Sequence, residues 1–158
     1  MTVAWRLVRP EQGTFERAFS GEGARLYGGR WNAPGRRVVY LSASLALAAL
    51  ETLVHADRHA FERDYLAFRL ELPDAAVLSL PGTELPAGWR ARPVSPAARA
   101  VGNAWLQDAA SLALWVPSVV VPLERNLLVN PGHPDWHAVR PSEPVAFRFD
   151  DRLDAGAA

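Results

Sequence analysis

Short runs in which apolar and polar residues alternate, or in which apolar residues stand together, dominate this chain and predict β-strands. Pro10 and Pro73 each close one of these runs, because proline has no backbone N–H to give to a sheet. The expected strands span residues 3–8, 37–41, 65–72, 77–80, 112–116, 119–121 and 145–149, and residues 126–130 form a further short apolar segment.

Two longer segments have the pattern of helices. An alanine- and leucine-rich run predicts a helix that is capped by Ser42 or Ser44 and extends to about Asp57. Ser95-Pro96 predicts a second helix start, since a serine N-cap is followed by proline at the first helical position. This second helix is expected to continue to near Asp108.

The remaining stretches predict loops. Residues 11–35 hold six of the eleven glycines and are expected to be mostly loop, with a helical turn near Phe15. Residues 81–95 contain three prolines and form the longest expected loop. Strands and helices do not alternate regularly, which favours an α+β sheet domain over a doubly wound parallel sheet. We expect one domain over residues 1–150 and a frayed tail over residues 151–158.

Composition narrows the classes of function. The net charge is zero, so no overall field draws the protein to nucleic acid or to an acidic membrane. The absence of cysteine excludes disulfides, thiolate nucleophiles and cysteine-ligated zinc. The first residues lack the pattern of a signal peptide, and no apolar run reaches the ~18 residues that span a bilayer. We therefore expect a cytoplasmic protein that binds neither membrane nor nucleic acid directly.

A glycine-rich turn carries the first candidate site residue. Arg30 follows Gly28 and Gly29, and all 17 basic residues of the chain are arginines. Small residues let the backbone approach a ligand, and a guanidinium binds phosphate through two parallel hydrogen bonds. The turn leads into a strand and does not open a helix, so it is not a Rossmann fingerprint. The alternative is an ordinary turn with a solvated arginine.

Glu51 is the second candidate, because it lies on a mainly apolar helix face. Its neighbours one turn away are Leu47, Ala48, Val54 and His55. A glutamate in apolar surroundings needs a partner, so it is either half of a core salt bridge with an arginine or a carboxylate of a functional site. The sequence alone leaves both interpretations open.

Two further residues have side chains that suit a ligand. Tyr40 ends the strand before the helix of Glu51, where its ring either stacks on a ligand or fills the core. Ser118 stands between two apolar runs and either donates a hydrogen bond to a ligand or closes a turn. No Gly-x-Ser-x-Gly elbow surrounds Ser118, so a hydrolase nucleophile is not expected.

Polar residues gather again later in the chain. Asn126, Asn130 and His133 stand near a Pro-Gly turn, and this group either shapes a pocket or only makes the turn. His133 and His137 have the spacing of a helical metal pair, but Pro134 lies between them. We therefore expect no metal site.

Together these motifs resemble the RES domain family, which is named after an arginine, a glutamate and a serine. The resemblance extends from about Trp5 to Phe149, with its motifs in the same order. The matching segments are Gly29-Arg30-Trp31-Asn32-x-x-Gly35, Val39-Tyr40-Leu41, the helix with Glu51, Pro117-Ser118, and Asn126-x-x-x-Asn130-Pro131-x-His133. The three residues of the family name fall on Arg30, Glu51 and Ser118.

The resemblance implies a toxin of a type II toxin–antitoxin system that acts on NAD. It implies a compact fold with a central, largely antiparallel split sheet, similar to the ADP-ribosyltransferase toxins. Members hydrolyse or phosphorolyse NAD, or transfer ADP-ribose to a protein, and need no cofactor beyond NAD as substrate. The implied partner is an Xre-like helix-turn-helix antitoxin that occludes the active site. Homo-oligomer formation stays open.

The expected roles follow from the chemistry of NAD cleavage. Glu51 would stabilise the positive charge that grows on the ribose, and Arg30 would bind the pyrophosphate. Tyr40 would stack on or orient a ring, Ser118 would bind the ribose or a phosphate, and Asn126 would shape the pocket. The alternatives are a mono-ADP-ribosyltransferase and a non-catalytic nucleotide- or protein-binding module. Neutral charge disfavours an RNase.

Overall fold

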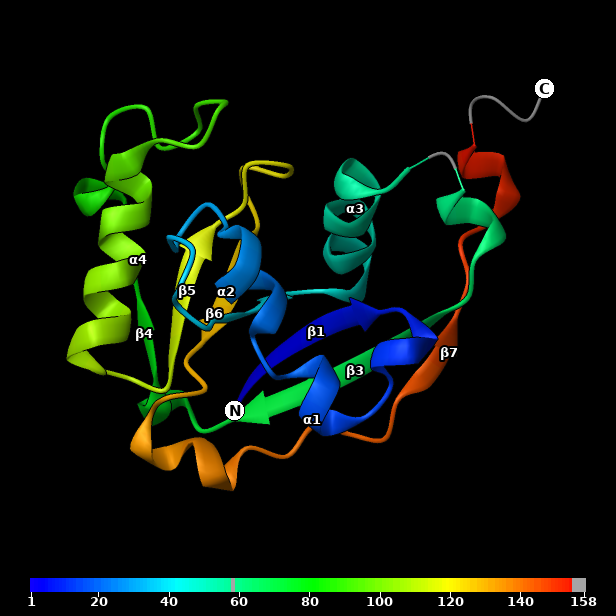
Figure 1. Ribbon diagram of the computed structural model, residues 1–158, viewed down its shortest axis with the longest axis horizontal. Helices are drawn as coiled ribbons and strands as arrows, with labels where there is room; N and C mark the ends of the chain where they lie inside the picture. The colour runs from blue at the N-terminus through cyan, green and yellow to red at the C-terminus, as the bar shows by residue number, and fades with distance from the viewer. Residues whose placement is uncertain (58, 155–158) are drawn as a thin grey trace.

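A seven-stranded sheet in the order β4-β5-β6-β2-β1-β3-β7 forms the centre of the computed structural model, which describes residues 1–57 and 59–154 (Figure 1). All neighbouring strands are antiparallel except β4 and β5. The strands are β1 (Thr2–Val8), β2 (Val39–Ser42), β3 (Tyr65–Leu72), β4 (Val77–Ser79), β5 (Ala113–Pro117), β6 (Arg125–Val129) and β7 (Val145–Phe147). The expected α+β domain with a largely antiparallel sheet is confirmed.

The sheet is split between β1 and β2. These strands pair through one register position, Trp5 opposite Ser42, whereas β1 and β3 pair along their whole length. The side chain of Arg6 reaches across the split, where its Nη1 donates to the carbonyl of Tyr40 at 2.7 Å. The carbonyl of Tyr40 thus accepts from a side chain, whereas in a continuous sheet it would accept from a backbone N–H of the neighbouring strand.

The two long helices begin where the sequence predicts. Helix α3 (Leu45–His55) is capped by Ser44, whose Oγ accepts from the N–H of Leu47 at 3.1 Å, so Ser44 and not Ser42 is the cap. Helix α4 (Pro96–Asp108) is capped by Ser95. In the part of the chain that is described, no helix is long and apolar enough to cross a membrane.

The glycine-rich segment contains more structure than predicted. Helix α1 (Phe15–Ala18) agrees with the expected turn near Phe15, but α2 (Glu22–Tyr27) lies where a loop was expected. The remaining short helices are 3-10 turns: Pro10–Gln12, Ala60–Glu62, Asp74–Ala76, Gly82–Glu84, Pro134–Ala138 and Asp151–Leu153. Residues 155–158 of the expected tail lie outside the described residues, so fraying there stays a prediction.

The expected strand over residues 119–121 is wrong. These residues bend away from the sheet after β5, and the N–H groups of Val120 and Val121 donate to Ser118 Oγ at 3.0 Å each. Because a local side chain takes the amides, they do not enter a ladder. The segment becomes the loop 118–124, which connects β5 to β6.

Alternation along β2 builds cores on both faces of the sheet. Val39 and Leu41 face one core, and Tyr40 faces the other, which α4 covers. Helix α4 approaches so closely that a Cβ at Gly102 would lie 1.7 Å from the carbonyl oxygen of Trp31. This contact holds the turn over residues 28–32 between α4 and the sheet.

Candidate active site

Three strand ends meet at one edge of the sheet, beside α3. Strand β2 ends at Ser42, β5 ends just before Ser118, and β6 begins beside Asn126. Asn126 is the register partner of both Ser42 and Val116, so antiparallel pairing brings these ends together. Figure 1 shows α3 and the loop after β5 at this edge.

The carboxylate of Glu51 receives two hydrogen bonds from this edge. Ser118 Oγ donates to Glu51 Oε1 at 2.8 Å, and Asn126 Nδ2 donates to the same oxygen at 2.6 Å. Glu51 forms no ion pair with any described residue, so the alternative of a core salt bridge is wrong there. The two bonds orient a half-buried carboxylate with neutral donors and leave its negative charge unpaired.

In the conformation observed, the Ser118 hydroxyl has no hydrogen-bonding capacity left for a ligand. Its fully buried hydroxyl accepts from the N–H groups of Val120 and Val121 and donates to Glu51. A hydroxyl has one proton and two lone pairs, so these three bonds use all of them. Ser118 therefore positions Glu51. A direct hydrogen bond from Ser118 to ribose or phosphate stays a prediction and would require the Ser118 side chain to rearrange.

Asn126 is held in turn by Ser42, which the sequence suggested only as a helix cap. Ser42 Oγ donates to Asn126 Oδ1 at 2.8 Å, and Ser42 is buried. Because the amide oxygen is occupied, the amide nitrogen is directed to Glu51. Ser42 thus belongs to the site, and a polar residue at a strand end was its only sequence signal.

We predict that Ser42→Ala lowers the rate of a reaction that depends on the Glu51 carboxylate roughly fivefold, without unfolding the protein. The change removes the bond that orients the amide of Asn126 and leaves the Ser118 bond in place. The measurement compares kcat and thermal melting of the variant with those of Ser20→Ala, which alters a partly exposed serine away from Glu51. Unchanged kcat would show that Ser42 has no positioning role.

Arg30 lies in the turn after Gly29 and holds the loop over residues 81–95. Its Nη1 donates to the carbonyls of Trp89 at 2.6 Å and Ala91 at 3.2 Å. Nε and Nη2 donate to none of the described residues, so part of the guanidinium stays available to a ligand.

The surroundings of Arg30 connect it electrostatically with Glu51. Burial lowers the pKa of the Arg30 guanidinium from its ordinary value, and the charge of Arg92 lowers it further. The charge of Glu51 acts on this pKa in the opposite direction, so the two groups are within electrostatic range. That the two charged side chains bind one ligand stays a prediction.

Tyr40 secures the glycine-rich turn from the sheet. Its hydroxyl donates to Asn32 Oδ1 at 2.8 Å and accepts from the N–H of Trp31 at 3.1 Å. Burial raises the pKa of this hydroxyl, so it keeps the proton that it donates. A Cβ at Gly29 would lie 2.5 Å from the Tyr40 oxygen, which explains glycine at that position. Stacking of the ring on a ligand stays a prediction.

Of the three polar residues predicted near the Pro-Gly turn, Asn126 joins the site, but Asn130 and His133 do not. Asn130 follows the opposite end of β6 from Asn126, about 13 Å along the strand. Its Oδ1 accepts from the N–H of Gly132, and His133 Nδ1 accepts from the N–H of Asp135, so both side chains stabilise the turn. Within residues 1–57 and 59–154, no three His, Asp or Glu side chains come together as metal ligands.

Comparison with known proteins places the chain in a family. Residues 3–150 match the RES domain. Toxin Res of Yersinia enterocolitica is 40% identical over 136 residues, which cover 85% of this chain and 90% of the relative. The Prs ADP-ribosylating toxin of a Sphingobium species is 37% identical over 158 residues, which cover 97% of this chain and 98% of the relative.

The fold agrees with a solved structure. A chain in the crystal structure of the M. tuberculosis MbcT-MbcA toxin-antitoxin complex superposes with a TM-score of 0.70 at 21% identity, covering 92% of this chain and 84% of that chain. The motifs around Arg30, Glu51 and Ser118 were the basis of the predicted resemblance, which the family match confirms. The chain belongs to the RES domain family.

Proposed function

We propose that this protein is a toxin that cleaves NAD at the bond between nicotinamide and ribose. The observation that carries the proposal is the carboxylate of Glu51, oriented by Ser118 and Asn126, without an ion-pair partner in the described structure and within electrostatic range of Arg30. NAD has a pyrophosphate for the cation and generates positive charge for the carboxylate. The family match supports the same substrate.

The reaction breaks the C–N bond to nicotinamide, which leaves with the bonding electrons. Positive charge then develops on the ribose ring, and the charge of Glu51 stabilises it. Both hydrogen bonds that Glu51 accepts from Ser118 and Asn126 fall on Oε1, which leaves Oε2 to face the ribose. Water or phosphate attacks the anomeric carbon through an oxygen, the new C–O bond replaces the broken C–N bond, and the proton that is lost passes to solvent.

The other residues bind and orient the substrate. Arg30 holds the pyrophosphate through its unoccupied nitrogens, and the ring of Tyr40 orients the nicotinamide end. Ser118 and Asn126 keep the carboxylate in place, so their contribution passes through Glu51. NAD is the substrate, and the mechanism uses no further cofactor or metal.

The relatives support a toxin with a protein antitoxin. The Yersinia and Sphingobium relatives are both named as toxins, and the solved structure is a toxin–antitoxin complex. We infer a cytoplasmic protein whose activity is restrained by an Xre-like helix-turn-helix antitoxin that covers Glu51. DNA binding belongs to that partner.

Transfer of ADP-ribose to a protein is the second candidate, because the Sphingobium relative is named an ADP-ribosylating toxin. The test incubates the purified protein with NAD, with and without phosphate, and identifies products by mass. All three reactions release nicotinamide: hydrolysis also gives ADP-ribose, phosphorolysis gives ADP-ribose phosphate, and transfer adds the ADP-ribose mass to the protein that is present as acceptor. NAD that stays intact in every arm would favour a non-catalytic binding module.

A further inference from the structure

Two serines at the end of β2 bond in the same way to the start of β6. Ser42 lies opposite Asn126 in the pairing of β2 with β6, and its Oγ donates to the Asn126 side chain. The backbone pairing continues one residue beyond β2, and Ser44 Oγ then donates to Glu124 Oε2 at 3.2 Å. Residues two apart on an extended segment face the same way. Glu124 therefore lies on the face of the sheet where Asn126 bonds to Glu51.

Glu124 also closes the loop 118–124. The N–H of Ser118 donates to the carbonyl of Glu124 at 3.0 Å, and the N–H of Glu124 donates to the carbonyl of Val121 at 2.9 Å. Leu123, at the apex of the loop, is 98% exposed and cannot anchor it by apolar packing. The position of the loop therefore depends strongly on its hydrogen bonds.

Two side-chain bonds hold the two ends of this loop against one helix. Ser118 donates to Glu51, and Glu124 accepts from Ser44, which is the cap of α3. Glu51 lies about 10 Å beyond the cap along the helix axis. Because the carbonyl of Glu124 bonds to the N–H of Ser118, a shift of Glu124 away from Ser44 would also move Ser118 relative to Glu51.

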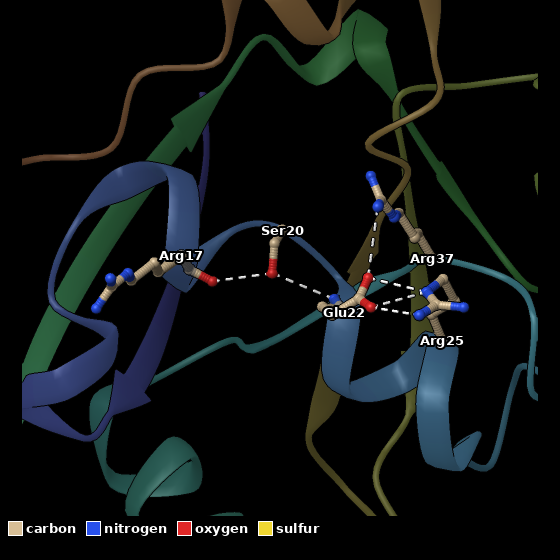
Figure 2. A network of polar contacts seen from close by, with 5 residues as sticks. All are labelled: Arg17, Ser20, Glu22, Arg25 and Arg37. Carbon is tan, nitrogen blue, oxygen red and sulfur yellow. Dashed lines mark hydrogen bonds and ion pairs between the residues drawn. The ribbon is translucent and has the colours of Figure 1, made fainter.

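Glu124 has no ion-pair partner, which distinguishes it from a glutamate such as Glu22. Glu22 accepts from Arg25 Nε at 2.9 Å through each of its oxygens, and Arg37 lies 3.4 Å from the same carboxylate (Figure 2). Within residues 1–57 and 59–154, Glu124 forms no ion pair, and the guanidinium of the adjacent Arg125 lies over a tryptophan ring of β5. The Glu124 carboxylate is instead directed to the first turn of α3, where the helix dipole favours negative charge.

We propose that Glu124 is a positioning residue for the reaction at Glu51. By accepting from Ser44, it holds the loop 118–124 on α3 and keeps Ser118 Oγ at bonding distance from Glu51 Oε1. Its contribution passes through Ser118 and involves no contact with the substrate. The inference rests on the proposed NAD chemistry for the rate, but the position of the loop is measured without NAD.

Hydrogen exchange on the protein without NAD measures the position of the loop. The N–H groups of Val120 and Val121 bond to Ser118 Oγ, so their exchange reports whether Ser118 stays in place. Glu124→Ala removes the acceptor of the Ser44 bond and is expected to raise these two exchange rates about tenfold. Glu124→Gln keeps an oxygen that accepts from Ser44 and is expected to exchange like the wild type.

The rate of nicotinamide release tests the connection to Glu51. We expect Glu124→Ala to lower kcat about fivefold, with KM within about twofold of the wild type, and Glu124→Gln to restore kcat. In a Ser118→Ala background, Glu124→Ala is expected to lower kcat no further, because both changes act through one bond. Glu143→Ala is the control, since Glu143 is an exposed glutamate outside the loop and outside α3, and it is expected to exchange and react like the wild type.

Each remaining outcome counts against the positioning role. Equal exchange in Glu124→Ala and the wild type would overturn it, and so would faster exchange with unchanged kcat, which would make Glu124 a structural residue only. Additive losses of kcat in the double variant would show that Glu124 does not act through Ser118. A wild type that leaves NAD intact would refute the proposed function, and the exchange rates alone would then decide whether Glu124 holds Ser118.

Discussion

Glu51→Gln lowers NAD cleavage about 10²–10³-fold and leaves the affinity for NAD nearly unchanged. The amide keeps an oxygen that accepts from Ser118 and Asn126, so the geometry of the site survives. It loses the negative charge, which acts mainly on the transition state, because positive charge on the ribose is small before the C–N bond breaks. The expected signature is therefore a low kcat with a preserved Kd.

The measurement combines initial rates of nicotinamide release with calorimetric titration of NAD. Glu62→Gln is the control, because Glu62 is an exposed glutamate outside the site, paired with His59. We expect this control to react like the wild type. Equal rates for Glu51→Gln and the wild type would remove Glu51 from the mechanism.

Arg30→Ala weakens NAD binding about 10- to 100-fold, with a smaller effect on kcat at saturation. A guanidinium that bonds to phosphate contributes equally to the ground state and to the transition state, so its loss raises Kd. The variant also loses the bonds to the carbonyls of Trp89 and Ala91, so the loop over residues 81–95 becomes less well held.

Arg30→Lys separates these two effects. Lysine keeps the charge but not the planar fork, so we expect an NAD affinity between those of the wild type and Arg30→Ala. Thermal melting of both variants reports the loss of the loop contacts. An NAD affinity that is the same in Arg30→Ala and the wild type would refute the role of Arg30 in binding the pyrophosphate.

Local signals predicted most of the long elements. Ser95-Pro96 identifies the start of α4 because capping and proline geometry act within one turn. The choice between Ser42 and Ser44 needed the structure, since both precede the same apolar run. There Ser44 caps α3, while Ser42 bonds to Asn126 across the sheet.

Glycines explain why α2 was missed. Gly21 and Gly28 flank this helix with φ of 67° and 70°, and such residues also occur in loops. The glycine-rich composition therefore predicted a loop where two glycines end a short helix. The strand expected over residues 119–121 was wrong because the Ser118 hydroxyl accepts from the N–H groups of Val120 and Val121. The apolar composition of the segment had predicted that these N–H groups pair in a sheet.

The site depends on contacts that no local pattern contains. Glu51 lies 67 residues from Ser118 and 75 residues from Asn126 along the chain. The resemblance to a family identified Glu51, Arg30 and Ser118, but their geometry comes from strand pairing. The bond that orients Asn126 was visible only after the sheet was assembled.

The central claim is that the carboxylate of Glu51 promotes cleavage of NAD. Its most direct test is the release of free nicotinamide from NAD by the purified wild-type protein and by Glu51→Gln, free of antitoxin. We predict that the wild type releases nicotinamide and that Glu51→Gln releases it about 10²–10³-fold more slowly. NAD that remains intact with the folded wild-type protein would contradict the account.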